Sequence, residues 1–180
     1  VINISGDQSK GLKSDQNMVL NGGNITINSF GGVVLESSGS GYNPSYCTAV
    51  KCDSILTVDG ATLKIKSTGI AGRGISTDYD FIMKNGTVEV TTTGAGSTFT
   101  NSTGTTDAYT ATCLSSDRNI QISNGSITLS GSGTGGKGIS CDGTLTVGAS
   151  NYNPIVTITT TGSKITISSS SGAGGGFGGG

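Results

Sequence analysis

Five aspartates recur at one position of a repeated pattern, and their carboxylates are the strongest candidates in this sequence for binding a metal ion or a ligand. The pattern is a small residue, an aliphatic residue, a polar residue, then Ser, Thr or Cys, then Asp. Its aspartates are Asp15, Asp53, Asp78, Asp117 and Asp142. If the repeats stack, the carboxylates form a column and repel one another unless they are neutralised. Either calcium bridges them, since it prefers oxygen ligands, or each accepts backbone N–H groups of its own turn.

One more aspartate and two arginines complete the candidates for metal binding or catalysis. Asp78 and Asp80 are the best local pair of carboxylates, because side chains two residues apart in an extended segment point the same way. The sequence has no histidine, which removes the usual general base and any Ser–His or Cys–His pair. A calcium-dependent polysaccharide lyase can use an Arg or Lys base instead of histidine, and Arg73 and Arg118 are the only arginines. We expect a protein that is not an enzyme, with a lyase as the third alternative.

Four tyrosines in predicted loops have the surroundings of a sugar-binding surface. They are Tyr42, Tyr46, Tyr109 and Tyr152, and both Tyr42 and Tyr152 begin a Tyr-Asn-Pro run. An aromatic ring offers a flat apolar face for stacking on a sugar, and polar neighbours offer hydrogen bonds. The alternative is that the rings lie on the flank of the fold and cover exposed sheet. Tyr152 falls at a different corner of the repeat, so a single continuous platform does not follow.

Four cysteines allow disulfide bonds if the chain is extracellular. Cys52 and Cys141 share one position of the pattern but lie three repeats apart, which is too far for a disulfide. We therefore expect these two to be buried as small hydrophobic side chains. Cys47 lies in a predicted loop, where it could bridge Cys113 or a neighbouring chain, and the sequence does not choose between them.

The elements that must position these residues are β-strands. Only 32% of the 180 residues are hydrophobic and 12% are charged, but the apolar residues alternate strictly with polar ones. Segments 25–27, 63–65, 127–129 and 165–167 show this period of two with β-branched residues, which indicates half-buried strands. No helical periodicity is present. The net charge of −1 gives no electrostatic case for nucleic acid, and no apolar run is long enough to span a membrane.

The spacing of the repeats predicts a right-handed single-stranded parallel β-helix over residues 1–168. The aspartates follow one another at steps of 38, 25, 39 and 25 residues. A step of 25 suits one rung of three short strands, and the longer steps suit a rung with an inserted loop. We expect about five to six rungs, at the usual spacing of parallel strands, and no capping helix. A second corner is expected where glycine supplies a positive φ, at Gly22-Gly23, Asp59-Gly60, Asn85-Gly86 and Asn124-Gly125.

The same period predicts which side chains fill the interior. Within each copy of the pattern the aliphatic residue points inward, the next residue points outward, and the Ser, Thr or Cys points inward again. The inward aliphatic residues are Leu12, Val50, Ile75, Leu114 and Ile139. The inward small residues are Ser14, Cys52, Thr77, Ser116 and Cys141.

The last copy of the pattern resembles a known family. The run Gly138-Ile139-Ser140-Cys141-Asp142-Gly143-Thr144-Leu145-Thr146-Val147, with the glycine-rich C-terminal end, is similar to bacterial, clostridial-type "carbohydrate-binding domain-containing" parallel β-helix proteins. Their fold is related to that of pectate lyases, and the likeness covers nearly the whole chain. It implies a secreted or cell-surface protein that binds plant cell-wall polysaccharide without catalysis. It also implies calcium on the solenoid, with metal or acidic sugar met at the aspartates. Earlier copies lack the Gly after Asp, which departs from the family's turn.

The sequence thus predicts an extracellular polysaccharide-binding or adhesion protein of the bacterial cell surface. The alternative is a structural subunit that stacks end to end into an extracellular filament, because the strands at both ends would keep unpaired edges and exposed core. The residues expected in such contacts are Val1, Ile2, Ile4, Ile165, Ile167 and Phe177.

A Ser- and Gly-rich tail, residues 169–180, follows the predicted β-helix. Its composition is that of a flexible linker. We predict instead that it lies extended against a sheet edge or groove, preferably of a neighbouring subunit, with Phe177 buried. Phe177 is the only large side chain of the tail, so it would supply most of the apolar burial that offsets the cost of ordering the glycines.

Overall fold

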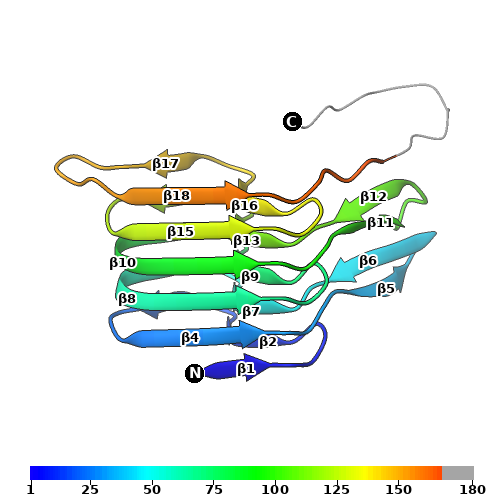
Figure 1. The fold of residues 1–180 in the computed structure, drawn as a ribbon, viewed down its shortest axis with the longest axis horizontal. Coiled ribbons are helices and arrows are strands. Elements are labelled where there is room, and N and C mark those ends of the chain that lie inside the picture. Colours follow the sequence, from blue (N-terminus) through cyan, green and yellow to red (C-terminus); the bar gives the residue numbers. More distant parts are fainter. Residues whose placement is uncertain (168–180) are drawn as a thin grey trace.

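Parallel β-strands make up this structure, a computed structural model that describes residues 1–167 (Figure 1). The chain is all-β over this range, and no helix within it is long and apolar enough to cross a membrane. Phe177 and the predicted tail lie outside the described residues. The strands are β1 (Ile2–Ile4), β2 (Lys10–Ser14), β3 (Met18–Leu20), β4 (Asn24–Ser29), β5 (Val34–Ser38), β6 (Gly41–Ser45), β7 (Thr48–Cys52), β8 (Leu56–Ser67), β9 (Arg73–Thr77), β10 (Phe81–Thr92), β11 (Ser97–Thr100), β12 (Thr106–Tyr109), β13 (Thr112–Ser116), β14 (Ile120–Ile122), β15 (Ser126–Gly131), β16 (Lys137–Cys141), β17 (Leu145–Val147) and β18 (Ile155–Thr160).

The repeated pattern forms one parallel sheet of five strands, in the order β16-β13-β9-β7-β2. Each strand carries one copy of the pattern, so neighbours in the sheet are consecutive copies along the chain. The register pairs Leu12 with Val50, Val50 with Ile75, Ile75 with Leu114, and Leu114 with Ile139. This long parallel sheet is compatible with the predicted β-helix.

A second, larger parallel sheet collects β1 and the strands that follow each copy of the pattern. β1, β4, β8, β10, β15 and β18 pair in that order. The short β3 pairs with β8, β14 pairs with β10, and β17 pairs with β14. In two repeats the strands on either side of the glycine corner join into the long strands β8 and β10, whose mutual register shifts around Asn85. Gly60 and Gly86 have φ values of 87° and 111° there, as the predicted second corner requires.

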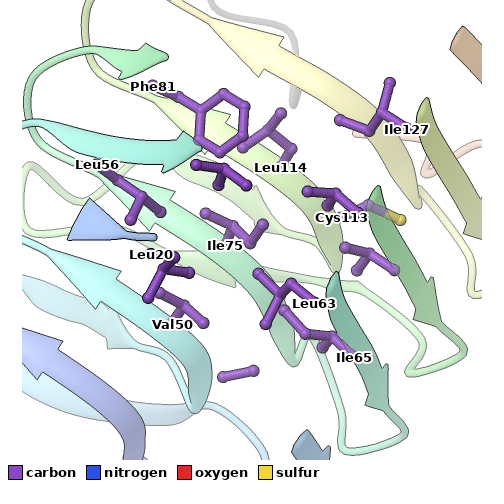
Figure 2. Close-up of a cluster of buried hydrophobic side chains, with 14 of the residues drawn as sticks. Leu20, Val50, Leu56, Leu63, Ile65, Ile75, Phe81, Cys113, Leu114 and Ile127 are labelled. Carbon is purple, nitrogen blue, oxygen red and sulfur yellow. The ribbon is translucent and has the colours of Figure 1, made fainter. Parts of the chain in front are cut away.

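The alternating apolar residues of both sheets fill one core (Figure 2). Val50, Ile75 and Leu114 are fully buried, which confirms the predicted inward aliphatic positions. Leu12 and Ile139 belong to the first and last copies of the pattern and are only half-buried, because a further strand covers them on one side only. Burying one such side chain contributes roughly 1.5–3 kcal/mol.

The cysteines differ from the sequence prediction. All four are free thiols. Cys47 directly precedes β7 and is fully buried, with its Sγ 3.1 Å from Ser29 Oγ. Cys113 lies on β13, two strands from β7, which is about 10 Å and beyond the reach of a disulfide. The Cys47–Cys113 bridge is therefore wrong. Burial raises the pKa of the Cys113 thiol. Cys52 is buried as expected, and Cys141 is half-buried.

A column of glycines lines a further corner, directly after the strands β1, β4, β8, β10, β15 and β18, and was not predicted. None of these glycines has a positive φ. Instead, a Cβ on Gly31 would lie 2.0 Å from the Gly6 carbonyl oxygen, and a Cβ on Gly94 would lie 1.7 Å from that of Gly69. The backbones of successive repeats therefore approach closely enough here that only glycine fits. The column comprises Gly6, Gly31, Gly69, Gly94, Gly133 and Gly162.

The two long repeats carry hairpins where the sequence predicted loops. β5 and β6 form the first hairpin and β11 and β12 the second, both antiparallel. Figure 1 shows both hairpins on the same side of the molecule, in cyan and green. The segment between β17 and β18, which contains Tyr152, lies at the opposite side.

Candidate binding site

The two hairpins contact each other and form one unit, here called the hairpin wing (β5, β6, β11 and β12). A parallel bridge joins Tyr42 to Asn101, and the Ser40 amide donates to the Ser102 carbonyl oxygen at 2.9 Å. The contact is so close that a Cβ on Gly41 would lie 2.3 Å from the Asn101 carbonyl oxygen. Two insertions that are far apart in the sequence therefore present a shared surface.

Polar contacts at its base fix the first hairpin to the body of the fold. Gln8 Nε2 donates to Glu36 Oε1 at 2.7 Å, and Lys10 Nζ donates to the Tyr46 carbonyl oxygen. The Arg73 guanidinium lies over the Tyr46 ring, 3.5 Å from its centroid, a cation–π contact. Burial among these groups lowers the pKa of Lys10. The wing is thus held in place from both sides of its first hairpin.

Tyr42 and Tyr109 lie on the wing and Tyr46 directly follows β6 at its base, but of these three only Tyr42 has an exposed ring. Tyr42 is 43% exposed on β6. Tyr46 is half-buried and has one face covered by an arginine, and Tyr109 is half-buried with its centroid 6.0 Å from that of Phe99. Tyr152 is 55% exposed but lies at the other side of the molecule. The four rings therefore do not form one platform.

The five aspartates stand in the predicted column, and lysines neutralise its first part. In the later four copies the aspartate amide donates to a carbonyl oxygen of the preceding copy, for example from Asp53 to Ser14 at 2.9 Å. Lys13 Nζ pairs with Asp15 and lies 3.0 Å from Asp53, while Lys51 lies 3.3 Å from Asp53 and also pairs with Asp78. No backbone N–H of the described residues donates to these carboxylates, so the expected turn role is wrong.

These pairs shift the titration of the groups that form them. Hydrogen bonding from Lys13 lowers the pKa of the Asp53 carboxyl, and hydrogen bonding to Asp15 and Asp53 raises the pKa of Lys13. The stabilisation from Asp53 is therefore complete above its unfolded pKa and is lost as the pH falls through its lowered folded pKa. That from Lys13 is complete below its unfolded pKa and is lost as the pH rises through its raised value. Both pairs are intact at neutral pH.

The second part of the column has no lysine. The outward position that holds Lys13 and Lys51 is serine in the last three copies, which leaves Asp117 and Asp142 without an ion pair to any described residue. Within residues 1–167, no three His, Cys, Asp or Glu side chains come together as a metal site. Two exposed carboxylates also supply fewer than the six to eight oxygens that calcium takes, so any calcium there would need water ligands.

Asp80 belongs to a polar corner, where its contacts are with Asn119 of the next repeat. Asp80 Oδ1 accepts the Asn119 backbone N–H at 3.1 Å and its side-chain amide at 3.0 Å. Asn119 Oδ1 accepts the Thr144 amide at 2.9 Å. One run of side-chain hydrogen bonds therefore links three successive repeats, because the polar residue follows the aspartate by two positions in each.

A pocket of about 230 Å³ opens beside this corner. Tyr79 and Arg118, which directly precede Asp80 and Asn119, stack with the guanidinium carbon 4.3 Å from the ring centroid. Sequence reasoning missed this site, although Tyr79-Asp80 and Arg118-Asn119 occupy equal positions in consecutive copies. The residues lining the pocket are Asp80, Phe81, Ile82, Asn119, Ile120, Gln121, Thr144 and Thr146.

These surfaces offer aromatic stacking and hydrogen bonding. Both arginines stack on tyrosines, and neither makes an ion pair with a carboxylate of residues 1–167. The wing and the corner offer aromatic rings with hydroxyl and amide groups around them, which suits a ligand rich in hydroxyls. In comparisons with protein-family models, curated proteins and solved structures, nothing matches this chain.

Proposed function

We propose that the chain is a non-catalytic, extracellular polysaccharide-binding protein of the bacterial cell surface, built on a right-handed parallel β-helix. The hairpin wing is the observation that supports this most. It holds Tyr42 exposed on a strand that is anchored to the body by Lys10 and Arg73. A rigid aromatic ring on such a surface binds the apolar face of a sugar at low entropic cost.

Tyr42→Ala is expected to lower retention of the protein on an insoluble polysaccharide at least tenfold, because the exposed ring is the proposed stacking surface. The measurement is a pull-down on cellulose and on pectin, with and without calcium. Tyr42→Phe keeps the ring and should keep retention, and Tyr152→Ala should change nothing, since Tyr152 lies away from the wing. If wild-type protein is retained on neither material, polysaccharide binding of this type is disproved. Equal melting temperatures with and without a chelator would show that calcium does not stabilise this fold.

End-to-end association into a filament is a second candidate, favoured by the apolar surface around the last strands. Ile155 and Ile158 of β18 are 65% and 45% exposed, and Leu145 and Val147 of β17 are 45% and 51% exposed. β18 pairs only with β15 within the described residues. Unpaired edges and exposed apolar residues of this kind favour strand pairing with another chain.

The residues that the sequence predicted for assembly contacts differ in their exposure to solvent. Val1 is 90% exposed and Ile167 is 47% exposed, whereas Ile4 is buried in the protein's own core. Ile2 and Ile165 are half-buried. We expect light scattering of the purified protein to show concentration-dependent growth, and Ile158→Lys to suppress it. A monodisperse monomer at high concentration would exclude assembly of the isolated chain.

A further inference from the structure

The pocket beside Asp80 is small and lies on the outer face of three adjacent strands. Ile82, Gln121 and Thr146 occupy one register across β10, β14 and β17, and Ile82 and Gln121 project on the face opposite to the buried residues of β10 and β14. A volume of about 230 Å³ is below the roughly 300–1,000 Å³ that holds a drug-sized ligand. It therefore suits a single ring, such as one sugar residue.

The polar groups of the pocket are mostly acceptors and hydroxyls. Asp80 uses Oδ1 to accept from Asn119 and donates nothing, and its second carboxylate oxygen receives no hydrogen bond from the described residues. Gln121 uses its amide nitrogen on Ser123 at 3.1 Å, which leaves its carbonyl oxygen for a ligand. The hydroxyl groups of Thr144 and Thr146 complete the lining. A ligand with several donors satisfies this set best.

The charge around the pocket is negative. Asp80 is the only ionisable side chain in the lining. Asp78, Asp117 and Asp142 each precede a lining residue by two positions, which is about 7 Å of extended chain and within a Debye length at physiological salt. Lys51 is paired with Asp78, and Arg118 lies over Tyr79. Arg118 and Lys84, which follows the lining residue Ile82 by two positions, have no ion pair within residues 1–167. The carboxylates of Asp80, Asp117 and Asp142, which are also without an ion pair to any described residue, outnumber these two cations. An anionic sugar is repelled here, and a cationic one is attracted.

We propose that this pocket binds one residue of an amino sugar whose amine is free and protonated. The ammonium group lies at the open oxygen of Asp80, and the hydroxyl groups bond Gln121, Thr144 and Thr146. The stack of Tyr79 and Arg118 flanks the site and keeps this corner in one conformation. This inference rests on the proposed function, because it names a sugar class for a polysaccharide-binding protein, but it places that recognition away from the hairpin wing.

Calorimetric titration of the whole chain with three soluble oligosaccharides tests the proposal. The probes are glucosamine oligomers, cello-oligosaccharides and oligogalacturonides, which are cationic, neutral and anionic. We expect the glucosamine oligomers to bind at least tenfold more tightly than the neutral ones, and the anionic ones to bind most weakly. Tighter binding of the oligogalacturonides, or no binding of the glucosamine oligomers, would overturn the proposal.

Two variants separate the pocket from the rest of the surface. Gln121→Tyr fills the pocket from an exposed position and should abolish glucosamine-oligomer binding. Asp80→Asn keeps an acceptor for Asn119 but removes the charge, so the preference for the cationic over the neutral oligomer should fall about tenfold. The matched control is Val19→Tyr. Val19 is exposed on β3 and is in register with Ile82 through Thr57 of β8, the strand between them, so it lies on the same outer face but away from the pocket. If Gln121→Tyr binds like Val19→Tyr, the pocket is not the site.

The same variants distinguish failure of this inference from failure of the proposed function. Retention on insoluble polysaccharide that depends on Tyr42 but not on Gln121, with no glucosamine-oligomer binding, would remove the pocket site and leave the wing. If the wild-type chain neither is retained on insoluble polysaccharide nor binds glucosamine oligomers, both the pocket site and the proposed function are wrong.

Discussion

Gly94→Ala is expected to destabilise the protein by about 3 kcal/mol or more, the upper range for overpacking. A Cβ at this position would lie 1.7 Å from the Gly69 carbonyl oxygen and 2.6 Å from its carbonyl carbon. Both atoms are backbone, so the clash cannot be relieved by rotating a side chain, and the two repeats must move apart. A free energy of unfolding of about 5–15 kcal/mol for a domain makes this a large fraction of the total.

Denaturant unfolding followed by circular dichroism measures this effect, and a second glycine is its control. Gly22 has a φ of 79°, and nothing lies within 4 Å of a Cβ built there. Gly22→Asn should therefore cost about 1 kcal/mol or less, because Asn adopts the left-handed conformation with little strain. If Gly94→Ala unfolds at the same denaturant concentration as the wild type, the close approach of the glycine column is wrong.

Gly41→Ala is expected to separate the two hairpins and to lower polysaccharide retention at least tenfold, while the body of the fold unfolds as before. A Cβ on Gly41 would lie 2.3 Å from the carbonyl oxygen of Asn101 and 2.4 Å from that of Thr100. These atoms belong to the second hairpin, so the clash is confined to the wing. Tyr42 would then lose the neighbouring strand that fixes its position.

Hydrogen exchange at the Ser40 amide reports this separation directly, because that amide donates to the Ser102 carbonyl oxygen across the hairpins. It should exchange much faster in Gly41→Ala than in the wild type. The control is Thr98→Ala, an exposed position on β11 of the second hairpin that lies outside the Tyr42–Asn101 contact, and it should leave both exchange and retention unchanged. Unchanged protection of the Ser40 amide in Gly41→Ala would show that the hairpins do not depend on this contact.

Much of the fold is predictable because it depends on spacing alone. Strict alternation of apolar and polar residues assigns side chains to two faces of a strand, and it correctly places Val50, Ile75 and Leu114 inward, where they are fully buried. The glycine corners follow from the need for a positive φ at Gly60 and Gly86. The regular recurrence of the aspartates also places consecutive copies side by side.

The candidate sites are less predictable, because they depend on which side chains meet across repeats. The aspartate column is expected from the sequence, but its neutralisation by Lys13 and Lys51 is not, because period-two analysis places these lysines outward without identifying their partners. Asp80 is expected to join Asp78, yet it bonds Asn119 of the next repeat. Both differences arise because neighbouring strands bring residues about 4.8 Å apart, and the sequence does not show which partner a side chain chooses.

Periodicity along the chain was enough to predict the all-β class, the repeat and the inward residues. Three other features became visible only in the folded structure: the two insertions contact each other, Cys47 is buried beside Ser29, and Arg73 covers Tyr46. These are contacts between segments whose approach is set by stacking of the repeats. The glycine column shows the same reason most clearly, because its requirement comes from the carbonyl oxygen of the repeat below and not from the backbone angles of the glycine itself.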